Sequence, residues 1–547
     1  MPLEALVTGR IATLAGPTGF GWVEAVGITG GRVAFAGSAV ELETRADPFT
    51  VRFELDPDEV AVPGLTDAHL HLADGGIAIE QVDLTTAQTL EAGLALIGEA
   101  ALRLAPEDWI EGHGWDSDRW GRWPTADDLE RGAPDRRVSL WAHDHHSLWV
   151  SHAALREAGL SRDSADPAGG LIRRDDAGDP SGILHETASR LVTSHIPGPS
   201  EDRYERLVGR LAAELVSLGV VAVHDPGSLA LQSGLGAAIA AYRGLAERGK
   251  LPLRVHACIR EEQLGAAIAA NLRSGARLGP DTDRARLGWL KLFADGTLGS
   301  RTAALLEPIE VEPGRPIPPG TERGVWMTPP DRLAELAERA ANAGIATMIH
   351  AIGDEAVRAA LDALEPTAAR VPLMPRVEHV QLLDPADRER FARGGIAASV
   401  QPIHLRSDAA AARRLWGARA EANGYTWRTI ADSGAVLAFG TDAPVEPIDP
   451  WPGLAMAVTR SDPSWPAGTP PFGPGEALTL ARALRAACIG PAESARETDR
   501  GRLIPGQRGD LVVLPIEALI EPVGPGGALA TARPRLVLVD GAVAYES

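Results

Sequence analysis

The chain has very little cysteine and no long apolar run. Its two cysteines, Cys258 and Cys488, are too few for a disulfide framework or a thiolate metal site, so any metal ligands must be histidines and carboxylates. The apolar runs fall far short of the roughly 20 residues that cross a bilayer. The first residues lack the basic and apolar regions of a secretory signal. We therefore expect a cytoplasmic protein without a membrane span.

Basic charge is also scarce. Lys plus Arg total 53 against 74 for Asp plus Glu, which gives a formal net charge of -21 at pH 7 and argues against nucleic acid or an anionic membrane as partner. All but two of the 53 basic residues are arginines, the exceptions being Lys250 and Lys291. We therefore expect a small-molecule substrate as the partner. The assembly that we consider for the chain is a homodimer.

The two ends of the chain predict antiparallel sheet, whereas the middle predicts alternating strands and helices. Short apolar runs with glycine-bearing turns occupy residues 1–59 and return in residues 502–547, so both segments are predicted to build one small β-sandwich. Residues 60–501 alternate strand-length apolar runs with amphipathic helices, as parallel βα units do. The predicted strands are Val60–Thr66, Val220–His224, Leu253–Cys258, Gly288–Ala294, Ile345–His350, Arg376–His379, Ile396–Gln401 and Ala435–Thr441.

Eight such strands predict an α/β fold with a (β/α)8 barrel of the TIM type. The stretch between the first two strands, residues 67–219, is too long for a loop. An inserted subdomain is therefore predicted after the first barrel strand, at about residues 75–205.

Five potential metal ligands lie at the ends of predicted barrel strands. His69 and His71 follow the first strand, and a spacing of two in extended chain points both imidazoles to one side. His350, His379 and Asp442 end three later strands. Because the carboxyl ends of the strands form one rim of a barrel, these side chains are predicted to converge on divalent metal. A single strand-end histidine is more often a core residue, so the prediction depends on the convergence.

Lys291 lies inside the otherwise apolar strand Gly288–Ala294. Burying a lysine is costly, and its use in a chain that otherwise uses arginine suggests that the amine itself is needed. A desolvated lysine, unlike arginine, can lose its proton and take up carbon dioxide as a carbamate, an anionic ligand able to bridge two metal ions. The alternative is a lysine that reaches a nearby carboxylate such as Asp295.

The order His-x-His, Lys, His, His and Asp resembles the amidohydrolase superfamily, and more narrowly its metal-dependent hydrolase branch that includes N-substituted formamide deformylase. The resemblance covers nearly the whole chain. Its motifs are Pro63-Gly64-x-x-Asp67-x-His69-x-His71, Trp289 to Gly296, His350-Ala351-Ile352-Gly353-Asp354, Thr441-Asp442-Ala443-Pro444-Val445, Gly501 to Gln507 and Asp510 to Leu514.

The resemblance implies a hydrolase with one or two divalent metal ions, zinc first, with manganese or iron as alternatives. It places His69, His71 and Asp442 on one ion and His350 and His379 on the other. Lys291, carboxylated by carbon dioxide, would bridge the two. The implied reaction is hydrolysis of a non-peptide C–N bond of an amide, formamide or carbamate by attack of metal-bound hydroxide, with Asp442 as the catalytic proton carrier.

The inserted segment is expected to shape the substrate pocket. For each candidate, packing between domains is the alternative, and a structural ion pair is the alternative for Arg301. The related branch more often has glycine where His145 stands and asparagine where Ser151 stands, so a relative's substrate cannot be carried over. The candidate substrate-binding residues are His113, Trp115, His146, Glu186, His224 and Arg301.

Two other functions stay open. A mononuclear deaminase of a nitrogen heterocycle could use the same barrel, but such enzymes tend to place a glutamate three residues after the fifth-strand histidine, where this chain has Gly353. Lys291 would also lack a role there. A non-catalytic binding relative would keep the barrel alone, although all six metal positions are filled. Metal content separates the three: two ions for the binuclear hydrolase, one for the deaminase and none for the binding protein.

Overall fold

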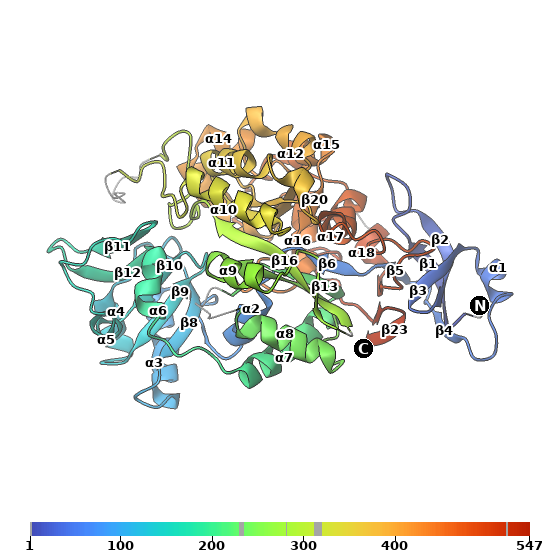
Figure 1. Ribbon diagram of the computed structural model, residues 1–547, viewed down its shortest axis with the longest axis horizontal. Coiled ribbons are helices and arrows are strands. Elements are labelled where there is room, and N and C mark those ends of the chain that lie inside the picture. The colour runs from blue at the N-terminus through green and yellow to red at the C-terminus, as the bar shows by residue number, and fades with distance from the viewer. Residues whose placement is uncertain (1–2, 229–234, 281, 311–319, 521–522) are drawn as a thin grey trace.

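The computed structural model describes residues 3–228, 235–280, 282–310, 320–520 and 523–547, and a parallel barrel lies at its centre (Figure 1). Eight parallel strands pair in the order β20-β19-β18-β17-β16-β14-β13-β6, and the short strand β15 (Arg277–Gly279) pairs antiparallel with β16. The barrel strands are β6 Leu65–Asp67, β13 Val220–Asp225, β14 Arg254–Arg260, β16 Thr282–Phe293, β17 Thr347–Ala351, β18 Arg376–His379, β19 Ala397–Val400 and β20 Leu437–Phe439.

The two outer strands of this order, β20 and β6, are joined by hydrogen bonds beyond their strand ends. Ala68 N donates to Phe439 O at 2.9 Å, and Asp442 N donates to His69 O at 2.6 Å. The parallel sheet is thus nearly closed into the predicted barrel. Strands β13, β17 and β19 are mainly apolar and fully buried, as parallel strands between a core and a layer of helices are.

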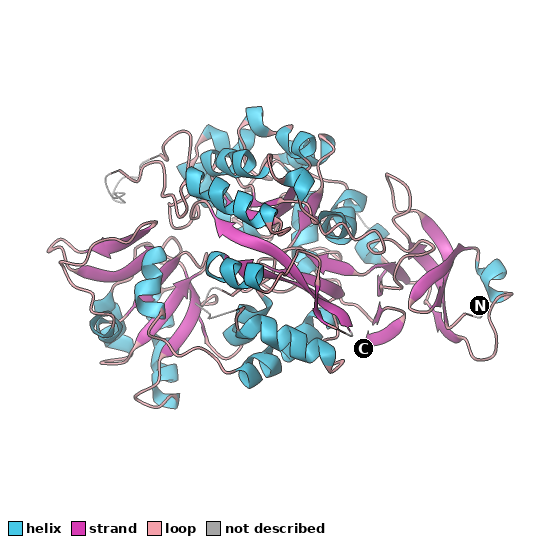
Figure 2. Ribbon diagram, in the orientation of Figure 1, coloured by secondary structure: helices cyan, strands magenta, loops and turns pink. Residues whose placement is uncertain are grey.

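Helices cover the outside of the barrel (Figure 2). They are amphipathic: α10 buries Leu333, Leu336 and Ala337 and turns its charged residues outward. None of the described helices combines the length and the apolarity needed to cross a membrane. The helical segments are α2 Leu72–Ala78, α7 Glu201–Ser217, α8 Ala237–Glu247, α9 Glu261–Ala269, α10 Pro330–Asn342, α11 Asp354–Leu364, η2 Ala368–Arg370, η3 Pro385–Asp387, α12 Arg390–Gly394, α13 His404–Leu415, α14 Ala418–Asn423, α15 Trp427–Asp432, α16 Pro450–Thr459, η4 Pro474–Glu476 and α17 Leu480–Ser494.

A second sheet is built from both ends of the chain, at the side of the barrel where the two termini lie (Figure 1). Its order is β23-β22-β21-β5-β1-β2-β3, with β4 beside β1, and β21 pairs antiparallel with β5. The two ends of the chain thus share one continuous mixed sheet, where a β-sandwich was predicted. Its elements are β1 Ala5–Ala12, β2 Trp22–Thr29, β3 Arg32–Gly37, α1 Ala39–Glu43, β4 Val51–Glu54, β5 Glu59–Pro63, β21 Leu511–Pro515, α18 Glu517–Ile520, β22 Leu536–Val539 and β23 Ala542–Glu546.

The predicted first barrel strand, Val60–Thr66, is two strands. Its first part belongs to β5 of the terminal sheet and its last part to β6 of the barrel, with Gly64 between them. A Cβ at Gly64 would lie 2.6 Å from Val221 Cγ2, so the chain crosses from one sheet to the other where only glycine fits. Both strands are buried, so the sequence shows one apolar run across them and does not indicate where the chain passes from one sheet to the other. The boundary between the two units lies at Gly64 rather than between residues 59 and 60.

The segment between β6 and β13 forms a separate subdomain on the opposite side of the barrel from the termini (Figure 1). Its sheet has the order β11-β12-β10-β9-β8-β7, and its core includes Trp115, Leu140, Trp149 and Ile183. Helices α2 and α7, which flank it in the sequence, pack on each other and belong to the barrel layer. The elements are β7 Val82–Asp83, α3 Leu90–Arg103, β8 Ile110–Trp115, α4 Ala126–Gly132, β9 Val138–Ala142, β10 Ser147–Val150, α5 His152–Glu157, β11 Gly170–Arg174, β12 Pro180–Glu186, η1 Thr187–Ser189 and α6 Arg190–Thr193.

Candidate metal centre

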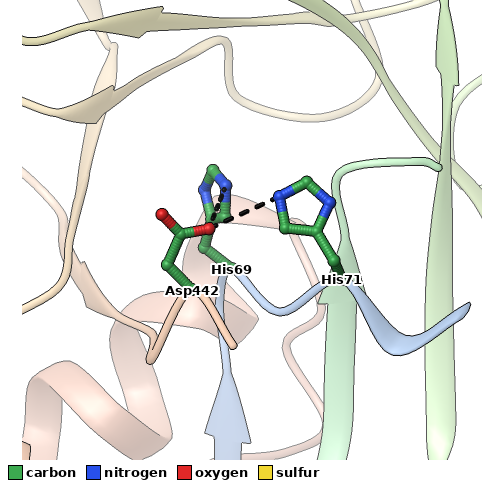
Figure 3. A group of neighbouring side chains, drawn as sticks. All are labelled: His69, His71 and Asp442. Carbon is green, nitrogen blue, oxygen red and sulfur yellow. Dashed lines mark ion pairs between the residues drawn. The ribbon is translucent and has the colours of Figure 1, made fainter. Parts of the chain in front are cut away.

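Three of the predicted ligands meet around one carboxylate oxygen (Figure 3). His69 follows β6, His71 lies at the N-terminal cap of α2, and Asp442 follows β20. The Nε2 atoms of both histidines lie 3.4 Å from Asp442 Oδ1. All three side chains are buried. Two strand ends that are far apart in the sequence thus present two imidazoles and a carboxylate to one point.

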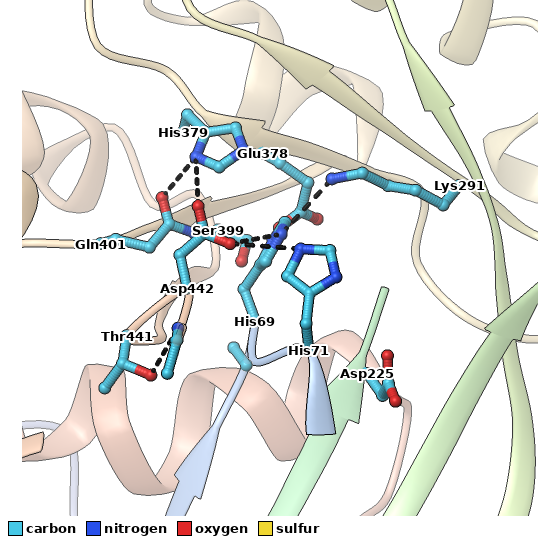
Figure 4. Close-up of polar contacts among 12 residues, drawn as sticks. His69, His71, Asp225, Lys291, Glu378, His379, Ser399, Gln401, Thr441 and Asp442 are labelled. Carbon is cyan, nitrogen blue, oxygen red and sulfur yellow. Dashed lines mark hydrogen bonds and ion pairs between the residues drawn. The ribbon is translucent and has the colours of Figure 1, made fainter. Parts of the chain in front are cut away.

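The other three predicted ligands adjoin this group. His379 Nδ1 lies 3.9 Å from Asp442 Oδ2 (Figure 4). The His350 and His379 rings are 4.4 Å apart between centroids. Lys291 extends toward the histidines, with its Nζ 3.4 Å from His69 Nε2. The alternative partner of Lys291, Asp295, accepts backbone N–H groups of loop and helix-start residues instead. The structure therefore brings all six predicted ligands into one buried cluster.

The backbone at two of these ligands is unusual. His379 has φ 74° and Asp442 has φ 60°, in the left-handed region that side chains other than glycine rarely adopt. Each such residue costs of order 1–3 kcal/mol and persists where surrounding structure holds it. Asp67 provides part of that support, since its carboxylate accepts hydrogen bonds from His69 N at 3.0 Å and Thr441 Oγ1 at 2.7 Å. Asp67 thereby links the two strand ends that carry the first group.

The hydrogen bonds of the four histidines fit a metal ion. In each ring one nitrogen faces an oxygen that can only accept, so that nitrogen carries the proton and the other keeps a lone pair, as in metal-ligating histidines. Asp442 Oδ1 is buried and, within the described chain, accepts no hydrogen bond. Imidazole nitrogen and carboxylate oxygen are the donors that zinc and similar divalent ions take. The contacts are His69 Nδ1 to Glu378 Oε2 (2.5 Å), His71 Nδ1 to Gly227 O (3.1 Å), His350 Nε2 to Gly296 O (3.2 Å) and His379 Nδ1 to Gln401 Oε1 (2.8 Å).

Glu378, beside His69, is itself held by Arg376. The Arg376 Nε donates to Glu378 Oε1 at 2.8 Å, and both side chains are fully buried on β18. Burial alone would raise the pKa of Glu378, but the charge of Arg376 and the contact with His69 lower it to about 2. The carboxylate is therefore ionised and fixes the orientation of the His69 ring.

The protonation states of the cluster suit metal binding except at His71, where burial would lower the pKa but contact with Asp442 raises it. Burial, with the nearby Lys291, lowers the pKa of His69 to about 4, so its imidazole is neutral. Burial lowers the pKa of Lys291 to about 8, which leaves part of the amine neutral near physiological pH. Burial would raise the pKa of Asp442, but the surrounding histidines, His69 first, hold it well below its usual range. Neutral imidazoles and an ionised carboxylate are the forms that ligate metal.

A cavity adjoins the cluster and includes residues of the inserted subdomain. Of the predicted substrate-binding residues, His146 lines it, and its ring lies 4.9 Å from that of His350. Glu186 lies behind His146: Oε2 contacts His146 Nδ1 at 2.6 Å, and Oε1 accepts from Thr302 Oγ1 at 2.5 Å. Glu186 thus orients His146, which lines the cavity.

The other four predicted substrate residues lie elsewhere. Trp115 is in the core of the insertion, where its Nε1 donates to Leu140 O at 2.8 Å. His224 lies beneath the cluster and contacts Arg376 Nη1 at 2.9 Å through Nδ1, so it does not face the rim. His113 lines a wider outer pocket that also includes His143 and Glu446. Arg301 lies 3.6 Å from Asp118 of the insertion, which matches the structural alternative.

Several residues of the site were not found from the sequence. His404, the first residue of α13, lies 3.5 Å from Asp442 Oδ2, and His379, His404 and Asp442 form a second group with mutually close ligand atoms. Glu446, after β20, contacts His143 at 3.2 Å and Arg406 at 2.8 Å. The signal available for His404 was its position three residues after Gln401, the last residue of a predicted strand.

Comparison with known proteins shows which family the chain belongs to, and the similarity extends over most of its length. The amidohydrolase family model matches residues 58–545. The Bacillus subtilis (strain 168) protein YtcJ, named as an amidohydrolase, is 31% identical over 90% of each chain, and N-substituted formamide deformylase of Arthrobacter pascens is 27% identical over 96% of this chain and 95% of the relative.

A solved structure also supports membership of this family. An uncharacterized metal-dependent hydrolase from Pyrococcus furiosus superposes with a TM-score of 0.69 at 28% identity, over 93% of this chain and 98% of that one. The predicted family is therefore confirmed: the chain belongs to the amidohydrolase family of metal-dependent hydrolases.

Proposed function

We propose that the protein is a binuclear amidohydrolase that hydrolyses a non-peptide C–N bond in a small amide, formamide or carbamate. His69, His71 and Asp442 would hold one divalent ion, zinc in the first place, and His350 and His379 a second. Lys291, carboxylated by carbon dioxide, would bridge them. The observation that carries the proposal is the position of Lys291 Nζ, buried and 3.4 Å from His69 Nε2.

A bound divalent ion would acidify a water molecule and polarise the substrate carbonyl. The protein's own residues supply the remaining steps. The Asp442 carboxylate, ionised and flanked by His69 and His71, would take a proton from the attacking water and deliver it to the leaving nitrogen. His146, oriented by Glu186, lies at the cavity wall where it could hold the substrate. His143, Asp144 and His146 of the insertion line this side of the cavity.

The deaminase alternative conflicts with the packing at Gly353. A Cβ at this position would lie 1.9 Å from Ala304 O, a backbone atom that cannot move aside cheaply. No glutamate fits at this position without rebuilding the loop. The neutral or carboxylated Lys291 would also be left without a function. We therefore place the binuclear hydrolase ahead of the deaminase.

The substrate is limited by what lines the cavity. His143, Asp144, His146 and Glu446 alternate there with a few apolar side chains such as Leu298 and Val445. This lining favours a small polar acyl group at the metal centre. The formamide deformylase among the relatives supports an N-formyl or N-acyl compound as the first candidate. A cytoplasmic location and a homodimer remain predictions.

The test is to load the purified protein with zinc or manganese and to assay N-formyl, N-acyl and carbamate compounds. We expect hydrolysis of at least one class, close to two metal ions per chain by elemental analysis, and loss of activity on chelation. The Asp442→Asn variant should lose more than about 100-fold in kcat, since a proton carrier contributes about 10²–10⁴-fold. Full activity in this variant, or in metal-free protein, would refute the proposal.

A further inference from the structure

His404 is close enough to the metal centre to be taken for a ligand. It begins α13, four residues after β19, and lines the cavity. Its Nε2 lies 3.5 Å from Asp442 Oδ2, and its ring stacks on that of His379 at 5.8 Å between centroids with planes 10° apart. By distance alone, His404 could therefore be a metal ligand as readily as His379.

The contact on the other side of the ring distinguishes His404 from the ligands. Its Nδ1 faces Gln381 Nε2 at 3.3 Å, and the same amide nitrogen donates to Asp408 Oδ2 at 3.0 Å. Tyr425 donates its hydroxyl to that oxygen at 2.9 Å. Burial raises the pKa of Asp408 to about 6. The oxygen of Asp408 that accepts from Tyr425 also faces the Gln381 amide nitrogen, so the amide presents its NH2 group there, whereas a reversed amide would place two acceptor oxygens against each other.

The tautomer of His404 follows from this chain of contacts. Its Nδ1 accepts a hydrogen bond from Gln381, so in the neutral ring the proton is on Nε2. The four predicted histidine ligands show the reverse pattern, with one nitrogen donating to an acceptor and the other free to ligate. His404 Nε2 is buried and makes no hydrogen bond among the described residues, with the nearest Asp442 oxygen 3.5 Å away.

We propose that His404 is a catalytic hydrogen-bond donor, not a metal ligand, and that its Nε2–H binds the carbonyl oxygen of the substrate. The inference rests on the hydrolase proposed above. As the water oxygen bonds to the carbonyl carbon, the C–O π pair moves onto the carbonyl oxygen, which His404 then stabilises. The electron pair on the carbonyl oxygen re-forms the C=O bond when the C–N bond breaks, and the leaving nitrogen takes the proton carried by Asp442. His404 keeps its own proton throughout, and Gln381 is the positioning residue that sets its tautomer.

Metal content gives the first test, independent of activity. His404→Gln and His404→Leu are compared with His379→Gln and with His152→Gln, which changes an exposed histidine paired with Asp127. A donor role predicts that both His404 variants bind as much zinc as the wild type, whereas His379→Gln binds less. Loss of about one ion per chain in both His404 variants would overturn the proposal.

The tautomer can be read directly by nitrogen NMR on protein labelled at histidine with ¹⁵N and loaded with zinc. The His404 signals are those that disappear in His404→Gln. We expect a protonated Nε2 and an unprotonated Nδ1, and we expect Gln381→Met, which removes the donor, to change that pattern. A protonated Nδ1 in the wild type would contradict the proposed donor.

Kinetics give the third readout. Removing one donor to a developing oxyanion costs about 10²–10³ in kcat, so His404→Leu should fall by that factor with KM changed far less. Gln381→Met should lose less, and His404→Gln, which offers an amide N–H, should recover part of the rate. Unchanged kcat in His404→Leu would refute the role. If the wild type cleaves none of the tested compounds, the hydrolase proposal fails, while zinc binding and the tautomer still decide whether His404 is a donor or a ligand.

Discussion

Lys291 shows how the fold sets the chemistry of a single side chain. It is buried on β16, its Nζ lies 3.4 Å from His69 Nε2, and burial lowers its pKa to about 8. If its carbamate bridges two ions, Lys291→Ala should reduce kcat by at least about 100-fold and reduce bound zinc, because an anionic ligand is lost from the centre. Adding a short carboxylic acid such as acetate should restore part of both. Lys250→Ala is the matched control, as it changes the chain's other lysine at an exposed position.

Zinc content and hydrolysis rates, each with and without added acetate, check this prediction. A Lys291→Ala protein with full zinc content and full activity would show that the amine has no part in the site. Reconstitution of the wild type in buffer freed of carbon dioxide should likewise give low activity until bicarbonate is added.

The ligands were predictable from the sequence at the residue scale because strand ends are recognisable. His69, His350, His379 and Asp442 each follow an apolar run, and parallel strands bring such ends to one rim. His404 was not predicted, since it belongs to the following helix and its function depends on Gln381. Trp115 was a candidate substrate-binding residue because its segment resembles the related branch, but the tryptophans of the insertion pack against one another, as in the packing alternative.

At the scale of elements, Gly64 decides how the terminal sheet joins the barrel. It separates β5 from β6, and a Cβ there would lie 2.6 Å from Val221 Cγ2 on β13. Gly64→Ala should push β6 away from β13 and destabilise the protein by about 1–3 kcal/mol, the usual cost of overpacking. Since β6 leads into His69, zinc affinity should fall as well.

Gly209→Ala provides the matched control for Gly64. This glycine lies within α7 with nothing within 4 Å of its Cβ position, so alanine should stabilise the helix by up to about 1 kcal/mol. Urea unfolding and zinc titration of both variants check the prediction. Equal stability of Gly64→Ala and the wild type would show that β6 and β13 have room to separate.

The insertion is joined to the barrel by an ion pair with a defined pH window. His143 Nε2, after β9, lies 3.2 Å from Glu446 Oε1, after β20. Burial alone would lower the pKa of His143, but the contact with Glu446 raises it to about 9. A folded pKa above the unfolded value of about 6.5 stabilises the protein fully below that value, and the contribution disappears as the pH rises through about 9.

The difference in unfolding free energy between the wild type and His143→Gln therefore depends on pH. We expect about 1.5–3 kcal/mol at pH 6, as for a hydrogen bond to a charged group, and a value near zero at pH 10. Urea unfolding at both pH values measures it, and His152→Gln, an exposed pair, should show a small difference at both. A difference that stays constant from pH 6 to 10 would show that His143 is not charged in the folded protein.

Elements were predicted well where the periodicity is clear and poorly where two sheets share one apolar run. All eight predicted barrel strands overlap observed strands, but Val60–Thr66 is shared between β5 and β6. The periodicity of apolar residues indicates that a strand is buried, but it does not indicate to which sheet the strand belongs. The small sheet of the insertion was predicted only as a subdomain, because strands such as β7 and β10 are short.

For the whole molecule, the terminal sheet is held to the barrel by a buried charge network. Arg254 on β14 is 3% exposed, lies 2.8 Å from Asp510 Oδ2 before β21, and also contacts Asp540 between β22 and β23. Asp540 in turn lies 2.9 Å from Arg508. Because β21 pairs with β5, this network fixes the sheet from which the chain passes through Gly64 into the first barrel strand.

Arg254→Gln removes the cation that pairs with the buried carboxylate of Asp510, and removing one partner of a buried pair costs about 3–5 kcal/mol. Arg52→Gln is the matched control, since Arg52 pairs with Glu43 at the surface and is expected to contribute about 0–1 kcal/mol. Calorimetry should show a lower unfolding temperature for Arg254→Gln only, and hydrogen exchange should become faster in β21 and β22 before it does in β17. If both variants lose the same stability, or if exchange accelerates first in the barrel, the terminal sheet is held by its apolar interface and not by this network.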